Sequence, residues 1–530
     1  MKIIFVTWGV LSGIGKGISA ASIGALLKSA WKKVYCQKFD GYLNVDPGTM
    51  SPFQHGEVFV TEDGAETDLD IGHYERFLDT DLNKFSSFTS GKLYEEVIMK
   101  ERRGDYLGGT VQIVPHLTDL VKEKIQAWFE STNADISIVE IGGTVWDMEN
   151  EYILESARQL RHDLWEENVQ FIHVALLPYL MASKELKTKP IQHSIRTLMS
   201  YGISPDFLIV RADTDIPDDM LGKIASSSWI KRENVISAPT LDTIYRVPVA
   251  FHKEHLWEKI LTNLRIPFMK LDMKPWEEFL ANIDASQDVI KIGMVGKYIG
   301  LEDAYYSLNE WLKCAGFAYK KRVKLRFVEA EDIEKEGTKL LEWLDGICIP
   351  GGFGTRGTEG MIRAAQYARE RNIPYLGICL GSQIMAIEFA RNVLGIADAS
   401  SEEFTPEGTA NIVHIMDHQK ELTTKWGNMR LWSYDCIIRS GTLAREVYKT
   451  ESTIERHRHR FEFNPLYRER MEAAWFIVSA TSPDGALAEI VELRDHPYMI
   501  ATQAHPELAS RPFAPHPLFM GFVKAMIHRV

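Results

Sequence analysis

Residues 374–383 read Pro374-Tyr375-Leu376-Gly377-Ile378-Cys379-Leu380-Gly381-Ser382-Gln383. A short apolar run ends at Gly377, and a segment with the apolar spacing of a helix follows Cys379, so the cysteine is predicted to lie on a strand-to-helix turn. The flanking glycines have no Cβ, which permits a tight turn and lets backbone N–H groups approach a substrate. A helix N-terminus beside the sulfur would also favour the thiolate. A lone cysteine is more often a small buried residue than a nucleophile, so this prediction depends on partners elsewhere.

Two further segments supply those partners. The apolar run at 498–501 leads into Gln503-Ala504-His505-Pro506-Glu507, where an extended backbone would place His505 and Glu507 on one face. Residues 347–354 read Ile-Cys-Ile-Pro-Gly-Gly-Phe-Gly, a buried-strand pattern that ends in a glycine loop whose N–H groups could stabilise an oxyanion. The three segments together predict a nucleophile, a base, a carboxylate that orients the base, and an oxyanion site.

The second half of the chain resembles the class I glutamine amidotransferases. The resemblance is carried by Pro-Gly-Gly at 350–352, Gly-x-Cys-x-Gly at 377–381 and His-Pro-Glu at 505–507, in this order. It implies that Cys379 attacks the side-chain amide of glutamine, that His505 shuttles protons and that Glu507 orients His505. It also implies a glutamine site and oxyanion donors formed by Gly352, Leu380, Gly381, Ser382, Gln383, Glu403 and Arg460. Free ammonia leaves this site, so the remainder of the chain is expected to hold an acceptor.

Length and composition indicate a soluble protein of two or three domains. The chain has 530 residues, 45% hydrophobic and 25% charged, which are ordinary values for globular proteins. A net charge of −13 argues against a nucleic-acid-binding surface. The five cysteines include no Cys-x-x-Cys pair, so a disulfide scaffold and structural zinc are not expected and a reducing, cytoplasmic location is. No apolar run approaches the roughly 20 residues of a membrane span.

The N-terminal segment has the layout of a phosphate-binding loop. A strand-like run at 3–11 leads into Ser12-Gly13-Ile14-Gly15-Lys16-Gly17, and helical spacing follows. The match to a Walker A motif is incomplete, because Gly17 stands where Ser or Thr would follow the lysine. An ordinary βα turn of a doubly wound sheet fits this loop equally well.

Charged residues follow several of the next strand-like runs. Residues 62–77 hold many carboxylates, which is typical of either a solvated acidic loop or a magnesium site. Glu140 stands at the end of a predicted strand at 135–141, where an α/β sheet places ligand contacts. Lys187-Thr188-Lys189 precedes a proline and fits either a triphosphate contact or a solvated basic turn.

The first half resembles the amidoligase half of the CTP synthase family. The resemblance lies in Gly15-Lys16-Gly17 and in residues 44–52, 54–60, 62–77, 100–108, 139–145 and 187–194, and the second half fits the same family at 293–298, 455–460 and 516–519. It therefore covers nearly the whole chain. The predicted organisation is an amidoligase domain at 1–267 with a P-loop-like site, a linker at 268–288 and a glutamine amidotransferase domain at 289–530, both domains being doubly wound α/β folds.

This resemblance implies that ATP phosphorylates the oxygen at position 4 of UTP and that channelled ammonia then displaces phosphate to give CTP. It implies an ATP site at Gly13, Ile14, Gly15, Lys16, Gly17, Ile18, Lys38 and Asp70, and magnesium held by Asp70 and Glu140. It implies a UTP and CTP site at Ser12, Asp147, Met148, Glu149, Lys187, Thr188, Lys189, Gln192 and Lys223, and His55 near the ammonia passage. Activation by GTP, feedback by CTP and a homotetramer are further expectations from the family.

Some residues depart from the family pattern. Trp8 and Trp146 stand where the family usually has glycine, Gly41 replaces a usual proline and Ala504 a usual aromatic residue. Two alternatives therefore stay open at the level of sequence. One is another two-part ligase, similar to cobyrinic acid diamide synthase; the other is a weakly active relative kept for binding or assembly.

Overall fold

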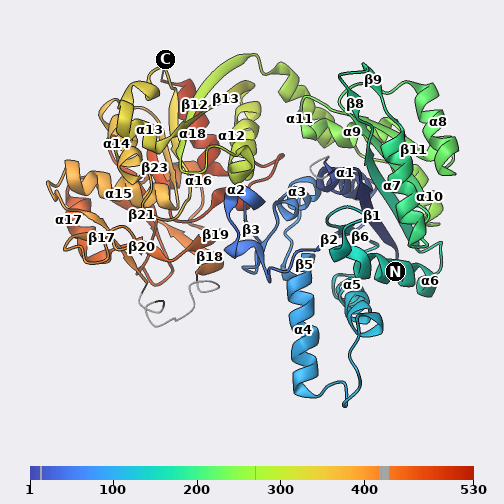
Figure 1. Cartoon of the computed structure of the whole chain (residues 1–530). Coiled ribbons are helices and arrows are strands. Elements are labelled where there is room, and N and C mark those ends of the chain that lie inside the picture. The colour runs from blue at the N-terminus through green and yellow to red at the C-terminus, as the bar shows by residue number, and fades with distance from the viewer. Residues whose placement is uncertain (12–14, 269, 417–418, 420–428, 530) are drawn as a thin grey trace. The chain divides into compact units, whose positions relative to one another are not determined.

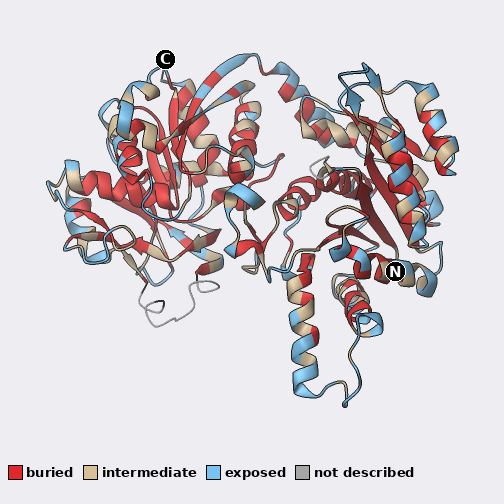
Figure 2. Cartoon of the chain, in the orientation of Figure 1, coloured by how far each residue is buried: buried red, intermediate tan, exposed pale blue. Residues whose placement is uncertain are grey.

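The computed structural model describes residues 1–11, 15–268, 270–416, 419 and 429–529 (Figure 1). The chain forms two compact units, the first made of Met1–Asp46 and Asp70–Leu280 and the second of Pro47–Leu69 and Ala281–Val530. In each unit a sheet forms the buried centre and helices cover it (Figure 2); the sheet is parallel in the first unit and mixed in the second. The predicted class, α/β with a doubly wound sheet in each half, is confirmed.

The first unit is built on a seven-stranded sheet with the order β11-β10-β7-β1-β6-β2-β5. Every neighbouring pair is parallel. Both faces are covered, which is why its strands read as continuous apolar runs. The loop after β1 leaves the middle of the sheet, where α/β folds bind ligands. The strands are β1 (Ile3–Gly9), β2 (Val34–Asp40), β5 (Ser87–Thr89), β6 (Ile136–Ile141), β7 (Val169–Leu176), β10 (Phe207–Ala212) and β11 (Val235–Pro239).

Helices cover both faces of this sheet. On one face α4, α5 and α6 pack on Phe5, Phe39 and Val139, and on the other α1 packs at Ile138. A short hairpin joins β8 (Tyr179–Leu180) to β9 (Glu185–Leu186). The helices are α1 (Lys16–Ser29), α3 (Leu69–Leu78), α4 (Ser90–Arg103), α5 (Thr118–Thr132), α6 (Glu151–Leu164), α7 (Lys189–Ser200), α8 (Asp218–Ser228), α9 (Val247–Lys253) and α10 (Leu256–Asn263). No helix in the described part of the chain is long and apolar enough to cross a membrane.

The second unit is built on a nine-stranded mixed sheet with the order β13-β12-β14-β15-β23-β22-β21-β18-β19. The pairs from β13 to β23 are parallel, and those from β23 to β19 are antiparallel. Its strands are β12 (Asp288–Gly296), β13 (Lys321–Glu329), β14 (Gly346–Ile349), β15 (Tyr375–Ile378), β18 (Arg430–Ile438), β19 (Ser452–His459), β21 (Phe476–Thr481), β22 (Ala488–Leu493) and β23 (Met499–Thr502). A small sheet of β16 (Ser400–Ser401), β17 (Asn411–Ile415) and β20 (Phe461–Phe463) lies outside it.

The core of this unit lies between the sheet and two helices, α14 and α15, whose buried faces include Met361, Ile384 and Ile387. Tight contacts place α15 directly behind β15, because both Gly377 and Gly381 lie against neighbouring backbone. The helices are α12 (Tyr306–Ala318), α13 (Ala330–Glu336), α14 (Thr358–Glu370), α15 (Leu380–Asn392), α16 (Leu443–Tyr448), α17 (Arg468–Ala473) and α18 (Pro517–Ile527).

Residues Pro47–Leu69 pack with the second unit, although the sequence places them in the first predicted domain. They contain α2 (Pro52–His55) and β3 (Phe59–Val60), which pairs antiparallel with β4 (Glu66–Thr67). Glu66 forms an ion pair of 2.8 Å with Arg458 of β19.

The predicted linker contains a helix, α11 (Lys274–Ala285), that buries Trp276. The domain boundaries at 267 and 289 stay a prediction.

Candidate active sites

Cys379 lies on the turn between β15 and α15, as the sequence predicts. Its backbone has φ 51° and ψ −100°, which residues with a side chain rarely adopt. The turn excludes larger neighbours, because a Cβ on Gly381 would lie 2.1 Å from the Ile349 oxygen and one on Gly377 would lie 2.6 Å from the Gly381 oxygen. The thiol is only 3% exposed. The packed strand and helix therefore hold the sulfur at one position.

His505 and Glu507 meet beside that thiol. His505 Nδ1 lies 2.7 Å from Glu507 Oε1. The expected extended segment is wrong in detail, since β23 ends at Thr502 and Pro506–Leu508 is a short 3₁₀ turn. The turn at the proline folds Glu507 back onto the imidazole. Burial alone would lower the pKa of His505, but Glu507 and Cys379 raise it from 6.5 to about 10. The site therefore favours an imidazolium next to the sulfur.

A cavity of about 430 Å³ opens at Cys379 within the second unit. Gly352, Glu403 and Arg460 line it, together with His505 and part of the 47–69 segment. Glu403 accepts a hydrogen bond from the Gly354 N–H at 2.7 Å. Burial raises the pKa of Glu403, while the Gly354 N–H, Lys297 and Arg460 act in the opposite direction. A carboxylate and a guanidinium on one wall suit the charged ends of an amino acid.

The first turn of α15 follows Cys379. It contains Leu380, Gly381, Ser382 and Gln383, all buried. A Cβ on Gly352 would lie 3.3 Å from the side chain of Leu380, so the glycine loop and the helix start face one another. Backbone N–H groups from these two segments are the predicted oxyanion donors.

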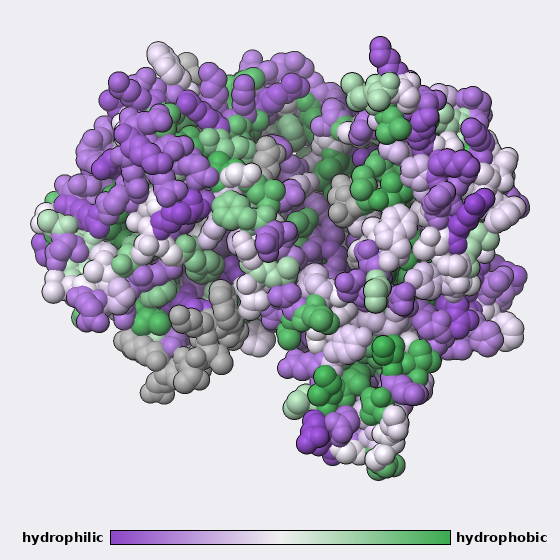
Figure 3. Space-filling model, viewed as in Figure 1, coloured by the Kyte–Doolittle hydropathy of each residue, from purple (hydrophilic) through white to green (hydrophobic). Residues whose placement is uncertain are grey.

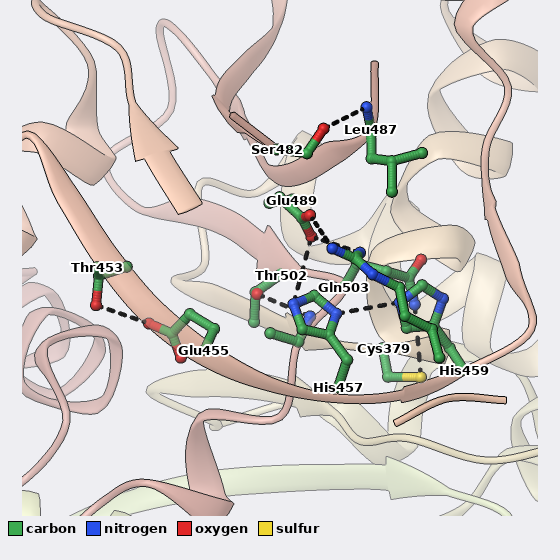
Figure 4. Close-up of polar contacts among 12 residues, drawn as sticks. Cys379, Thr453, Glu455, His457, His459, Ser482, Leu487, Glu489, Thr502 and Gln503 are labelled. Carbon is green, nitrogen blue, oxygen red and sulfur yellow. Dashed lines mark hydrogen bonds and ion pairs between the residues drawn. The ribbon is translucent and has the colours of Figure 1, made fainter. Parts of the chain in front are cut away.

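Behind the thiol lies a buried polar network on β18, β19 and β22 (Figure 4). Arg430 makes a bidentate ion pair with Glu489 at 2.7 and 3.2 Å. His457 Nδ1 lies 3.1 Å from His459 Nε2. Burial, assisted by Arg430, holds the pKa of both histidines well below 6.5. The two imidazoles are therefore neutral and serve as fixed hydrogen-bonding groups beneath the site.

In the first unit, the loop after β1 ends at Gly15, which caps α1 with a φ of 83°. Lys16 Nζ lies 2.9 Å from Glu140 Oε1 and 4.3 Å from the centre of the Trp8 ring. Gly17 lies against Asp70, since a Cβ there would be 1.9 Å from the carboxylate. Ile18 follows in the first turn of α1. The predicted residues Ser12, Gly13 and Ile14 lie outside the described residues.

Two lysines and two carboxylates converge at the carboxyl edge of the sheet: Lys16, Lys38, Asp70 and Glu140. We call them the lysine–carboxylate cluster. Lys38 Nζ lies 2.6 Å from Asp70. Burial raises the pKa of Glu140 to about 7; Lys16 opposes this shift and Asp70 adds to it. Among the described residues no group of three or more His, Cys, Asp or Glu side chains could hold a metal. A cation at Asp70 and Glu140 would therefore need further oxygen ligands, such as phosphates.

The predicted pyrimidine-site residues occupy three elements. Asp147 accepts from the Thr144 N–H at 2.5 Å at the start of a 3₁₀ turn that holds Met148 and Glu149. Thr188, Lys189 and Gln192 belong to the start of α7, with Gln192 Nε2 3.2 Å from Thr188 Oγ1. Lys187 and, less strongly, Lys223 of α8 lower the pKa of Glu185. No hydrogen bond or ion pair between described residues joins the 147–149 turn to residues 187–192.

Comparison with known proteins decides the family. A family model described as CTP synthase N-terminus matches residues 2–266, and one described as glutamine amidotransferase class-I matches residues 301–525. The chain is 50% identical to a CTP synthase of Halalkalibacterium halodurans over 529 residues, covering 100% of this chain and 99% of the relative. This chain belongs to the CTP synthase family.

A second curated relative agrees with this assignment. The chain is 50% identical to a CTP synthase of Bacillus subtilis over 527 residues, covering 99% of this chain and 98% of the relative. It is also similar to the solved glutaminase domain of Trypanosoma brucei CTPS with bound acivicin, at 38% identity over 46% of this chain and 95% of that chain, with a TM-score of 0.43.

The sequence analysis missed several groups around Cys379. Gln503 and the pair His457 and His459 stood in quoted segments, but no spacing rule pointed to their contacts. Lys297 donates to the Phe353 oxygen at 3.2 Å, and burial lowers its pKa to about 8. The Lys297 ammonium group therefore helps to hold the glycine loop in place. The available signal was the alternation of arginine and histidine along residues 456–460, because a strand places alternate residues on one face and so brings His457 and His459 together.

The raised pKa of His505 makes a prediction about stability. Folding favours its protonated form, so that contribution is complete below about pH 6.5 and is lost as pH rises through about 10. Glu507→Gln removes the main cause of the shift. We expect this variant to lose about 1–3 kcal/mol of unfolding free energy near neutral pH. The difference in unfolding free energy between the variant and the natural chain should shrink as pH approaches 10, measured by urea unfolding at several pH values. A gap that is constant or widens with pH would contradict it.

Proposed function

We propose that this chain converts UTP to CTP, using ATP and ammonia that it releases from glutamine. It is then a carbon–nitrogen ligase of the CTP synthase family. The observation that carries the proposal is the presence, in one chain, of a Cys379–His505–Glu507 site at a cavity and of a buried lysine–carboxylate cluster at a phosphate loop.

In the glutaminase site, Cys379 is the nucleophile. His505 receives the thiol proton, the sulfur attacks the side-chain carbonyl carbon of glutamine, and His505 then gives a proton to the departing ammonia. Glu507 holds the imidazole by its Nδ1 and stabilises the imidazolium. Glu403 and Arg460 bind the charged ends of glutamine, and the backbone N–H groups near Gly352 and Leu380 stabilise the oxyanion.

In the amidoligase site, ATP transfers its terminal phosphoryl group to the oxygen at position 4 of UTP. Transfer of this kind needs charge neutralisation more than covalent help. Lys16 and Lys38 supply positive charge, and the 12–18 loop surrounds the ATP phosphates. Mg²⁺ would neutralise phosphate charge when bound, and Asp70 and Glu140, two neighbouring carboxylates of which one has a pKa raised to about 7 by burial, fit a hard cation.

UTP, and CTP as a feedback inhibitor, would be bound by residues 147–149, 187–192 and Lys223. GTP would act as an activator of glutamine hydrolysis, and His55 would lie near the ammonia passage. These assignments rest on the family. No observation favours the two alternative readings, another ligase or an inactive relative.

The exposed apolar side chains of the α4–α5 hairpin support self-association into a homotetramer. Leu107 is 96% exposed, and Ile98, Met99, Ile113 and Val114 are exposed beside it. Apolar residues gather over this hairpin in Figure 3. A patch of this kind is typical of an interface between subunits.

The first test is CTP formation from UTP, ATP and Mg²⁺ with either glutamine or ammonium as nitrogen donor. We expect the natural chain to use both donors. Cys379→Ala should use ammonium at the natural rate and lose glutamine-dependent activity by at least roughly a thousandfold, because nothing else in the site attacks the amide. Chelation of Mg²⁺ should stop both reactions. If neither donor gives CTP while glutamine is still hydrolysed, the acceptor is not UTP.

The second test concerns the hairpin. Leu107→Asp places a charge on the exposed apolar surface and should weaken assembly about 10-fold or more, measured by light scattering during gel filtration. Leu466→Asp is the matched control, because Leu466 is 87% exposed but belongs to the second unit and not to the hairpin. Equal masses for both variants and the natural chain would show that the hairpin is no interface.

A further inference from the structure

The side-chain amide of Gln503 is directed at the sulfur of Cys379 (Figure 4). Its Nε2 lies 3.6 Å from Sγ, and the side chain is 3% exposed. Parallel pairing of β15 with β23 brings the two together: Ile378 is in register with Thr502, and the Cys379 N–H donates to the Thr502 oxygen at 2.8 Å. Cys379 and Gln503, the residues that follow this pair, therefore lie next to each other.

A backbone carbonyl sets the direction of this amide. The Phe461 oxygen accepts from Gln383 Nε2 at 3.1 Å and lies 3.0 Å from His459 Nδ1. A carbonyl can only accept, so Gln383 must turn its NH₂ group toward it. The second N–H of that group reaches Gln503 Oε1 at 3.3 Å. With its oxygen engaged in this way, Gln503 presents N–H to the sulfur.

This orientation matters for the charge on sulfur. The Arg458 carbonyl oxygen lies 3.8 Å from Sγ, where it accepts from a thiol but repels a thiolate. An N–H donor on the same sulfur stabilises the thiolate and offsets that repulsion. An amide turned the other way would add a second oxygen and favour the thiol.

We propose that Gln503 is a catalytic residue of the glutaminase reaction. It donates a hydrogen bond to the Cys379 thiolate, and the Phe461 carbonyl fixes its direction through Gln383. This inference rests on the proposed role of Cys379 as the nucleophile. Gln383 acts here as a positioning residue, besides its expected place in the glutamine site.

The test is the pH dependence of Cys379 alkylation by iodoacetamide, which does not require glutamine binding. Gln503→Met fills the same space without a donor, and Gln503→Glu places a carboxylate oxygen at the sulfur. We expect the alkylation profile to move to higher pH in both variants, more in Gln503→Glu, and glutamine-dependent CTP formation to fall roughly 10-fold to 100-fold. Gln383→Glu should move the profile in the same direction although residue 383 does not touch the sulfur.

Ammonium-dependent CTP formation reports that each variant is folded, and Gln366→Ala on α14 is the matched control with an unchanged profile. Profiles of the Gln503 variants that superimpose on the natural one would overturn the proposal. If instead the proposed role of Cys379 as the nucleophile is wrong, Cys379→Ala will retain glutamine-dependent activity, which distinguishes the two failures.

A second observation concerns the backbone of six tryptophans. Their φ angles are positive, between 53° and 141°, and their side chains are 51% to 85% exposed: Trp31, Trp165, Trp229, Trp343, Trp432 and Trp475. A side chain with a Cβ is strained in this region, and glycine is not. Because most of each indole is exposed to water, its burial contributes little to the free energy of folding. At these sites the backbone has a φ angle typical of glycine, whereas the residue carries the largest of the side chains.

Helix ends show the same mismatch. After α1, the Trp31 N–H donates to the Lys28 oxygen and the Lys32 N–H to the Leu27 oxygen, the two bonds of a Schellman motif. After α8, the Ile230 N–H donates to the Ala225 oxygen around a left-handed Trp229. The residue at this position in the motif is usually glycine.

Two tryptophans, in contrast, fit their surroundings. Trp257 and Trp311 are buried, and their indole N–H groups donate to His252 Nδ1 at 3.2 Å and to the Glu507 oxygen at 2.6 Å. Trp8 belongs with the mismatched set, because its indole nitrogen is buried and has no hydrogen-bond partner among the described residues. These described tryptophans therefore differ in how well their sites suit an indole.

We infer that the source cell inserts glycine at these seven positions, through a codon that is read as tryptophan in the sequence as written. UGA is such a codon, since its meaning differs between genetic codes, whereas UGG specifies tryptophan. Glycine at position 8 removes the ring beside Lys16 and opens the phosphate loop.

The gene and the natural protein test this inference. We expect UGA at the seven positions and UGG at Trp257 and Trp311, and peptide masses from protein purified from the source cell that fit glycine at 31 and 229. A recombinant chain with glycine at all seven positions should melt several degrees higher than the chain as written. UGG at Trp31 and Trp229, or tryptophan in those peptides, would overturn the inference. Trp257→Gly, the matched control, should melt lower.

Discussion

The parallel pairing of β15 with β23 is the constraint on which the glutaminase site depends. It ties the Cys379 N–H to the Thr502 oxygen and so sets the distance between the nucleophile and the segment that carries Gln503, His505 and Glu507. A slip of one residue in this register would move the whole segment after β23 relative to Cys379. Gly377 and Gly381 allow α15 to approach closely enough for the pairing to continue to the end of β15.

The first unit solves a different electrostatic problem. Lys16, Lys38 and Glu140 are buried at the carboxyl edge of its sheet and Asp70 is partly buried, and burial of charge is costly unless partners offset it. Lys16 and Glu140 lie 2.9 Å apart, and Lys38 lies 2.6 Å from Asp70. These two pairs offset the buried charges, and Asp40 Oδ1 adds a further carboxylate 3.4 Å from Lys38 Nζ.

Much of this could be predicted from sequence, because strands, glycine turns and helix starts are local patterns. The turn at Cys379 and the start of α1 after Gly15 follow from residues within ten positions of each other. The 3₁₀ turn at Glu507, the packing of residues 47–69 with the second unit and the contact of Gln503 with sulfur could not be predicted. Each depends on strand order and register between segments more than 100 residues apart, which apolar periodicity does not specify.

Positive φ angles at residues other than glycine have two different causes in this chain. At Cys379 the positive φ is imposed by its surroundings, since a strand hydrogen bond on one side and a buried helix on the other leave no alternative, and strain that persists in this way marks function. At Trp31 and Trp229 the helix end requires a left-handed residue, which glycine would supply without strain, and the indoles are 75% and 76% exposed, so burial offsets little of the cost. The same φ therefore indicates catalysis where the core enforces it, and a mismatch of residue identity where the surface leaves it unsupported.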